Sequence, residues 1–219
     1  MVTVGFPIYN RYDLLPQVVQ ALVDGNRKPD KIVIVDNGLK FNNKMLSLVE
    51  GTVDVQVLSP SRNMGVAYAW NKIIEYSKGS DCIIMNDDIL VHKDTIYTMT
   101  NTTGYVVCCS PLSAINAFSL FAIRPWCVEA VGLFDESISP EYAYYEDNDF
   151  AYRMKLLDLE IVRAEVGADH IHGGSATFKK FTKEEEKVHH FRFRLAQSNY
   201  IKKWGGLPTE EKYLTPYNK

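Results

Sequence analysis

Short apolar segments alternate with helical patterns through the first hundred residues. Each apolar segment is rich in β-branched residues and short enough for a buried strand; these segments are residues 2–6, 32–35, 53–58 and 82–85. Apolar residues at helical spacing follow the first three of them, at residues 14–22, 45–49 and 66–76. Because strands and helices alternate in this order, we predict an α/β fold with a doubly wound, mostly parallel sheet.

The regular alternation is lost in the second half of the chain. Strand-like segments are found there at residues 105–107, 118–123 and 160–166. They predict a smaller part of the fold in which strand directions are mixed. A helix is expected at about residues 146–157, where Phe150, Met154 and Leu157 share one face. We expect that face to lie in the core.

A charged segment at residues 183–204 also has a helical pattern. Phe191, Leu195 and Ser198 fall on one stripe of this predicted helix. The stripe predicts that the helix packs through these residues, outside the core or against a partner.

Length and composition favour one domain over residues 1–219. A chain in which 46% of the residues are hydrophobic buries a sizeable core. The net charge of -3 and a pI near 6.0 provide no basic surface for nucleic acid, which is therefore not an expected partner. There is no apolar run of the roughly 18 residues that span a bilayer and no basic leader, which predicts a cytoplasmic protein. The four cysteines lack CxxC spacing and are predicted to be reduced core thiols.

Polar clusters follow the predicted strands of the first half. They occur at residues 7–10, 36–38, 61–65 and 86–88. In a parallel sheet the ends of these strands converge on one edge, where such folds bind ligands. Ordinary turns use the same residue types, so each cluster alone is a weak indication.

Three of these clusters carry groups suited to a nucleotide. Asp36 can accept a hydrogen bond from a base, and Asn63 and Gly65 allow the backbone to approach a ligand closely. Arg62 is a cation suited to phosphate or to a carboxylate, or else a solvated surface residue.

Two groups of residues could hold a metal ion. Asp87 and Asp88 are adjacent, so we expect one of them to face a ligand, unless the pair caps the following turn. Carboxylate oxygens suit Mg²⁺ or Mn²⁺, and a diphosphate would complete the coordination. His170 and His172 precede a Gly-Gly pair just beyond a predicted strand, where they are either metal ligands or structural histidines.

Acidic residues gather where the helix at about 146–157 begins. The helix dipole favours such residues whatever the protein does, and Asp149 is spaced to pair with Arg153. Asp147 is less well explained in this way, because neighbouring carboxylates repel one another. A general base that takes a proton from an attacking hydroxyl is a plausible role for it.

Six motifs occur in order along the chain, and together they are specific. They are Phe6-Pro7-Ile8-Tyr9-Asn10-Arg11, Val35-Asp36-Asn37-Gly38, Asn63-x-Gly65-x-Ala67-x-x-x-Asn71, Asn86-Asp87-Asp88, Gly132-Leu133-Phe134-Asp135-Glu136, and Glu146-Asp147-x-Asp149-Phe150 with Arg153. This set resembles the family 2 glycosyltransferases of the GT-A fold, in the branch that includes rhamnosyltransferase-like enzymes. The resemblance extends from about residue 2 to residue 175.

The resemblance implies a role for each candidate residue. The nucleotide-sugar donor would be held by Pro7, Tyr9, Asn10, Asp36, Arg62, Asn63, Gly65, Asn86 and Asp87. Asp88 would bind Mn²⁺ or Mg²⁺ together with His170 or His172, with His172 slightly preferred. Where the family usually has the triplet Asp-x-Asp, this chain begins with Asn86, which removes one negative charge from the metal site. Asp147 would be the catalytic base.

The resemblance therefore implies a metal-dependent, inverting glycosyltransferase that takes a UDP- or dTDP-linked sugar to the hydroxyl of a glycan or another acceptor. The nucleotide-binding half would be about residues 1–100, the acceptor and catalytic half about 101–180, and the helical tail 181–219. Other domains of a larger protein could be partners. One alternative is a module that binds nucleotide sugars without transfer, which the Asn86 replacement permits. Another is a nucleotidyltransferase, although no glycine- and lysine-rich loop follows Phe6.

Overall fold

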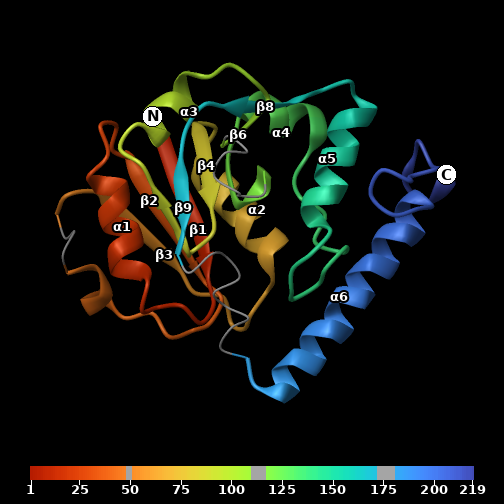
Figure 1. Cartoon of the computed structure of the whole chain (residues 1–219), viewed down its shortest axis with the longest axis horizontal. Helices are drawn as coiled ribbons and strands as arrows, with labels where there is room; N and C mark the ends of the chain where they lie inside the picture. The colour runs from red at the N-terminus through yellow and green to blue at the C-terminus, as the bar shows by residue number, and fades with distance from the viewer. Residues whose placement is uncertain (48–50, 110–116, 172–180) are drawn as a thin grey trace.

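The computed structural model describes residues 1–47, 51–109, 117–171 and 181–219 (Figure 1). Its main sheet contains, in order across the sheet, β3 (Asp54–Leu58), β2 (Lys31–Asp36), β1 (Val2–Ile8), β4 (Asp81–Met85), β7 (Leu120–Ile123), β6 (Val106–Cys109) and β8 (Ile161–Ala164). The first four are parallel to one another, whereas β7 runs antiparallel to both β4 and β6. The predicted α/β fold with a parallel part and a mixed part is confirmed.

Helices cover both faces of this sheet. The covering helices are α1 (Leu15–Val23), α2 (Val66–Tyr76), α3 (Thr95–Asn101), α4 (Pro125–Val131) and α5 (Glu146–Leu156), and the long α6 (Lys183–Trp204) packs outside α5. Alternate residues of β2 show how the faces divide, because Ile32 and Ile34 pack with α1 while Val33 and Val35 pack with α2. A strand buried on both faces needs this continuous apolar sequence. In Figure 1, α5 lies between the sheet and α6.

The predicted strands and the longer helices agree with the structure, whereas the shortest helices do not. The bounds of α2 and α6 are those expected, and α5 ends one residue early. The helix expected at residues 45–49 is wrong: the structure has the short 3-10 helix η1 (Asn43–Leu46), and residues 48–50 lie outside the described part. The sequence analysis missed α3, α4, and the small sheet of β5 (Ile89–Val91) and β9 (Ala168–His170).

Two predictions of buried helix faces need correction. Leu157 is 50% exposed, because α5 ends at Leu156 and Leu157 is turned away from the core that buries Phe150 and Met154. On α6, Phe191 and Leu195 face solvent. That helix packs instead through the stripe of Ala196, Tyr200 and Trp204, whose large aromatic rings bury more apolar area than the predicted stripe would.

The sequence explains where α6 begins and where it ends. Thr182 caps the first turn by accepting from the amide of Glu185, whose side chain accepts in return from the amide of Thr182. Gly205, at a φ of 77°, ends the helix in the left-handed conformation that glycine adopts without strain.

The four cysteines are buried and free, as predicted. Within the described ranges, no helix combines the length and the apolar character that crossing a membrane requires.

Candidate active site

The polar loops after the parallel strands share one edge of the sheet. Ile8 at the end of β1 is in register with Asp36 at the end of β2, and β4 lies parallel to β1 on its other side. The predicted convergence of these strand ends is confirmed. The loop at residues 61–65 joins them, because it connects β3 to α2.

Asp36 is held by the loop that follows it. The carboxylate is buried and accepts hydrogen bonds from the Tyr12 hydroxyl and from the Phe41 amide, the latter at 3.0 Å. Burial and the Asp36 carboxylate together raise the pKa of Tyr12 above its usual value, so the phenol keeps its proton and remains a donor. The carboxylate is therefore fixed in position at the edge of the sheet.

The loop after β2 also holds the loop before α2. The Asn37 side chain donates to the Gly65 carbonyl at 3.0 Å and accepts from the Met64 amide at 3.2 Å. Asn63 accepts from the Gly65 amide at 3.0 Å, which closes a tight turn. Gly65 has a φ of 89°, and a side chain there would collide with the backbone of Tyr142. Glycine is thus required both by the backbone angle and by the close approach.

A second loop, residues 139–145, leads into α5 and rests on the turn at Gly65. The Val66 amide donates to the Tyr142 carbonyl at 2.7 Å. Arg62, which the sequence analysis offered for phosphate, lies 2.9 Å from the carboxylate of Glu141 and is 64% exposed. We call residues 139–145 the α5 loop. Its contacts place the start of α5 at the same edge as the strand-end clusters.

Pro7, Tyr9 and Asn10 stand at the end of β1. Pro7 is in register with Val35, and Tyr9 exposes 43% of its surface beyond the last strand residue. The Tyr142 phenol is close enough to Tyr9 for the two to interact electrostatically. The end of β1 therefore faces the α5 loop.

Asp87 and Asp88 follow β4, with the buried Arg11 nearby. Burial first, and then the charge of Asp88, raise the pKa of Asp87 to about 7, against the opposing effect of Arg11. The Arg11 guanidinium is itself paired with Asp13 at 3.1 Å. Adjacent carboxylates are the kind of oxygen ligand that Mg²⁺ and Mn²⁺ prefer.

The structure brings His170 to Asp88, as a shared metal site requires. Pairing of β5 with β9 sets His170 opposite Ile89, and the His170 Nε2 lies 3.8 Å from the Asp88 Oδ1. A carboxylate oxygen and an imidazole nitrogen this close are positioned to share one divalent cation. His172 lies outside the described residues. Within those residues, no group of three side chains forms a complete metal site.

The backbone amide of Asn86 donates to the Ser119 carbonyl at 2.9 Å, which fixes the start of the loop after β4.

The α5 loop is strained immediately before the acidic residues. Tyr144 and Tyr145 have positive φ angles of 94° and 66°, which cost about 1–3 kcal/mol each for residues with a side chain. Glu146 follows, buried, with a pKa raised to about 8 by burial and by Asp147. Its Oε2 has no hydrogen-bond partner among the residues that the structure describes. Such strain and such unpaired polar groups occur where function requires them.

Asp147 lies partly exposed at the first turn of α5. Burial raises its pKa, while its Oδ1 accepts from the Asn148 amide at 2.8 Å. A carboxylate with a raised pKa takes up a proton more readily than an ordinary aspartate. This is the property that a general base needs.

The charge of the Asp149 carboxylate, in contrast, is balanced by its partners. It is 0% exposed, accepts from the Trp204 indole at 2.8 Å, and pairs with Lys203 at 2.6 Å and with Arg153 at 2.9 Å. The predicted pair with Arg153 is confirmed. Lys203 also reaches Asp135 at 2.6 Å, so one ammonium group joins α6 to two acidic residues. Asp149 is therefore a structural residue.

Sequence reasoning missed the partners that come from α6. Lys203 and Trp204 contact Asp149, and His189 lies 3.0 Å from the Tyr142 hydroxyl and 3.5 Å from that of Tyr144. The sequence carries no spacing rule for contacts between such distant residues. Arg11 could have been found, because it is the last residue of the first motif.

Comparison with known proteins gives one family. The family described as "Glycosyl transferase family 2" matches residues 3–114, about half of the chain. No curated protein matches the sequence significantly.

Solved structures share the fold. The mannosyltransferase PcManGT from Pyrobaculum calidifontis, in complex with GDP-Man and Mn²⁺, superposes with a TM-score of 0.61 at 17% identity, over 80% of this chain and 58% of that one. TarS 1-349 from S. aureus, in complex with UDP-GlcNAc, gives a TM-score of 0.59 at 12% identity, over 87% of this chain and 65% of that one. The present chain thus spans less than two thirds of either protein. At these identities the similarity establishes the fold.

Proposed function

Because the chain belongs to glycosyl transferase family 2, we propose that it is a metal-dependent, inverting glycosyltransferase that transfers the sugar of a UDP- or dTDP-linked donor to an acceptor hydroxyl. One observation carries the proposal. The α5 loop, which positions Asp147, rests directly on the turn at Gly65, so the proposed base and the strand-end clusters belong to one edge of the sheet. A transfer reaction needs donor and base in this proximity.

We assign the donor to the loops after β1, β2, β3 and β4. The fixed carboxylate of Asp36 and the exposed ring of Tyr9 would contact the base and ribose, and the turn at Asn63 and Gly65 would approach the donor through its backbone. The two similar structures described above contain GDP-Man and UDP-GlcNAc, which supports a nucleotide sugar as the donor.

We assign the metal ion to Asp88 and His170. The chemistry that the ion supplies when bound is neutralisation of the departing diphosphate. Asp87 adds negative charge beside Asp88 and thereby favours a divalent cation at this position. Arg62 is engaged by Glu141, so it would reach the diphosphate only by exchanging that exposed ion pair, which is weak.

Asp147 would act as the base in a single displacement. The acceptor hydroxyl attacks the anomeric carbon and gives its proton to the Asp147 carboxylate. The new carbon–oxygen bond forms as the bond between the anomeric carbon and the phosphate oxygen breaks, and the nucleoside diphosphate leaves with the electron pair. Attack from the side opposite the leaving group inverts the anomeric configuration.

The test is the variant Asp147→Asn, which keeps the shape and removes the base. We expect loss of transfer by at least about 100-fold with nearly unchanged donor affinity, in line with the usual contribution of a general base. Asp158→Asn is the matched control, because Asp158 is exposed just beyond the other end of α5. Full turnover by Asp147→Asn would disprove the assignment.

Donor and ion can be identified together by thermal unfolding with UDP-, dTDP- and GDP-linked sugars, each with Mn²⁺ and with a chelator. A ligand that binds the folded chain raises its Tm by mass action. We expect one donor to raise the Tm only when the metal is present. Donor binding without any transfer or donor hydrolysis would instead identify a nucleotide-sugar-binding module.

A further inference from the structure

The outer face of α6 carries a stripe of exposed apolar residues. Val188, Phe191 and Leu195 expose 50%, 65% and 37% of their surface, and their helical spacing places them next to one another. Phe191 and Leu195 belong to the stripe that the sequence predicts as a packing face, and the structure leaves them uncovered. Exposed apolar residues that are grouped rather than scattered mark interaction sites. We call these three residues the outer stripe.

The surroundings of the outer stripe are basic. Residues 187–204 hold five of the 24 lysine and arginine residues of the chain and none of its 27 acidic residues. Lys187, Arg194 and Lys202 are exposed, and helical spacing places them on the same face as the outer stripe. Lys187 pairs with Glu184 at 2.9 Å, but an exposed pair of this kind contributes little. This face is therefore cationic, although the whole chain has a net charge of -3.

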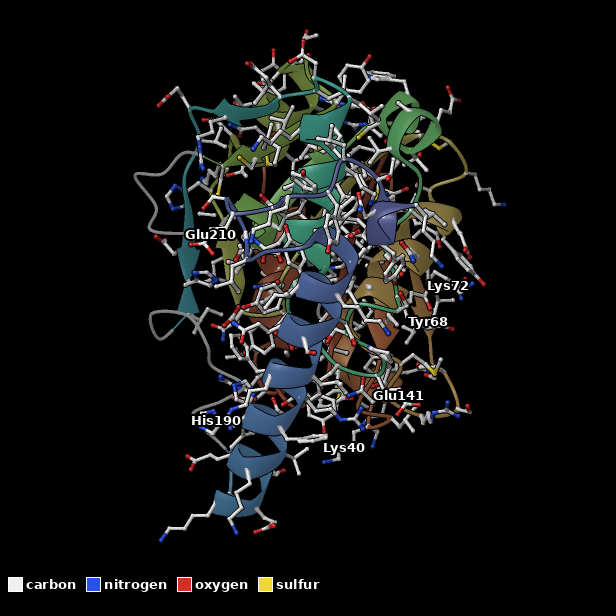
Figure 2. The ribbon with its side chains drawn as sticks, turned by 90° about the vertical axis from the view of Figure 1, so that its right-hand side faces the viewer. Lys40, Tyr68, Lys72, Glu141, His190 and Glu210 are labelled. Atoms are coloured by element: carbon white, nitrogen blue, oxygen red, sulfur yellow. The ribbon has the colours of Figure 1, made fainter. Side chains whose placement is uncertain are left out.

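The inner side of α6 is occupied, whereas its outer face is open. Ala196, Tyr200 and Trp204 pack on the protein, and the His189 ring lies 3.0 Å from the Tyr142 hydroxyl of the α5 loop. Figure 2 looks onto α6, and none of the other elements that the structure describes lies in front of its first turns. In both views these turns extend beyond the sheet and the helices that cover it (Figures 1 and 2). The helix thus presents a projecting surface that is held in place from behind.

We propose that the outer face of α6 docks on the surface of an anionic lipid bilayer. A helix that lies in the plane of such a surface places its apolar side chains among the acyl chains just below the headgroups. The lysine and arginine residues beside them then contact the lipid phosphates. The outer stripe supplies the first kind of contact, and the exposed cations around it supply the second. Docking of this kind needs no helix that crosses the bilayer, and it does not depend on the proposed transfer reaction.

Charge and packing argue against other occupants of this face. In a second copy of the chain, the cations of one α6 would meet those of the other, and like charges in contact cost free energy. Nucleic acid would neutralise the cations but would leave Phe191 without an apolar partner. A protein groove that encloses a helix needs access to most of its circumference, and the inner side of α6 is already packed. An anionic bilayer satisfies both the apolar and the cationic side chains.

The test is flotation of the whole chain with vesicles of phosphatidylcholine alone and of phosphatidylcholine with about one third phosphatidylglycerol. Neither donor nor metal is added, so the result is independent of catalysis. We expect binding to the anionic vesicles, at least about tenfold weaker binding to the neutral ones, and release by high salt. No binding to the anionic vesicles, or equal binding to both kinds, would overturn the proposal.

Two variants test the apolar and the charged contacts separately. Phe191→Ala should weaken binding to the anionic vesicles about tenfold, because it removes the most exposed side chain of the outer stripe. Arg194→Gln should weaken it about fivefold, the contribution of one cation near an anionic surface. Because both side chains are exposed, the variants should keep the wild-type Tm. Wild-type binding by both variants would contradict the assignment to α6.

Matched controls come from exposed residues elsewhere in the chain. Tyr97 on α3 is 57% exposed, and Lys28 is exposed in the loop before β2. Neither Tyr97→Ala nor Lys28→Gln should change vesicle binding. Losses equal to those of the α6 variants would show that the lipid does not select the outer face of α6.

Phe191→Trp tests whether the outer stripe enters the bilayer. On anionic vesicles the new tryptophan should move to an apolar environment, so its emission should shift to shorter wavelength relative to the wild-type chain, whereas Tyr97→Trp should show no such shift. An unchanged emission on bound vesicles would contradict insertion. Sedimentation velocity without lipid gives the last outcome. A dimer that Phe191→Ala abolishes, together with absence of vesicle binding, would assign the face to a second copy of the chain instead.

Discussion

Two pairs of acidic residues in this chain have different surroundings. Asp135 and Asp149 share the ammonium group of Lys203, and Asp149 also has Arg153 and the Trp204 indole. Asp87 and Glu146 lie at the edge that carries the loops, and their pKa values are raised to about 7 and about 8. The first pair shares direct ion-pair partners, whereas burial and a neighbouring acid outweigh the effect of Arg11 on Asp87 and raise the pKa of Glu146.

The difference shows how to separate structural acids from functional ones. A carboxylate whose charge is balanced by partners within the fold stabilises that fold, and it has little remaining attraction for a cationic ligand. A carboxylate held beside other acids costs stability until a cation or a proton arrives. By this criterion Asp149 serves the fold, and we propose a binding role for Asp87.

The strongest test of this contrast is Asp149→Ala. Removal of the carboxylate leaves Arg153 without its ion-pair partner, Lys203 with Asp135 alone, and the Trp204 indole without its acceptor. We expect a loss of about 3–5 kcal/mol in the free energy of unfolding, measured by urea denaturation. Asp54→Ala is the control, because Asp54 is 66% exposed and pairs with Lys31 at 3.9 Å. Its loss should stay below about 1 kcal/mol, and an equal loss in both variants would contradict the contrast.

Glu146→Gln should stabilise the folded chain, whereas Asp149→Ala should destabilise it. The pKa of Glu146 in the folded chain, about 8, is above its usual value of 4.5, because burial disfavours the charged form; the fold is therefore more stable when Glu146 is protonated. This contribution is complete below pH about 4.5 and is lost as the pH rises towards 8. The variant lacks this loss. Its free energy of unfolding relative to wild type should therefore rise by on the order of 2 kcal/mol between pH 5 and pH 8. Urea denaturation at several pH values measures this free energy, and a difference between the two proteins that does not change with pH would contradict the prediction.

The sign of the effect should depend on metal for Asp87→Asn. Because the pKa of Asp87 in the folded chain is also raised, to about 7, the substitution without metal should increase the free energy of unfolding at pH 8 by on the order of 2 kcal/mol, as in Glu146→Gln. With Mn²⁺ the sign should reverse, because the wild type gains stability from the bound ion and the variant gains less. Thermal unfolding with and without Mn²⁺ shows this reversal. Equal Mn²⁺-induced shifts of Tm in both proteins would show that Asp87 does not contribute to the metal site.

The sequence predicts the fold better than the site, for a physical reason. Strands such as β1 and helices such as α2 are encoded in the local apolar pattern, and parallel order then brings their ends to one edge. The pairing of Arg62 with Glu141 joins residues 79 positions apart, and no periodicity indicates it. Phe191 faces solvent for a similar reason, because the aromatic contacts of Tyr200 and Trp204 decide which face of α6 packs against the protein.

Lys203 has a consequence for how the protein forms as it is synthesised. Its carboxylate partner Asp135 precedes it by 68 positions, and the Trp204 indole follows its acceptor Asp149 by 55. On the ribosome, the sheet and α5 therefore emerge before Lys203 and Trp204, when Arg153 is the ion-pair partner already present for Asp149. We expect the nascent chain to hold α5 loosely until the end of α6 has been synthesised and can contact it.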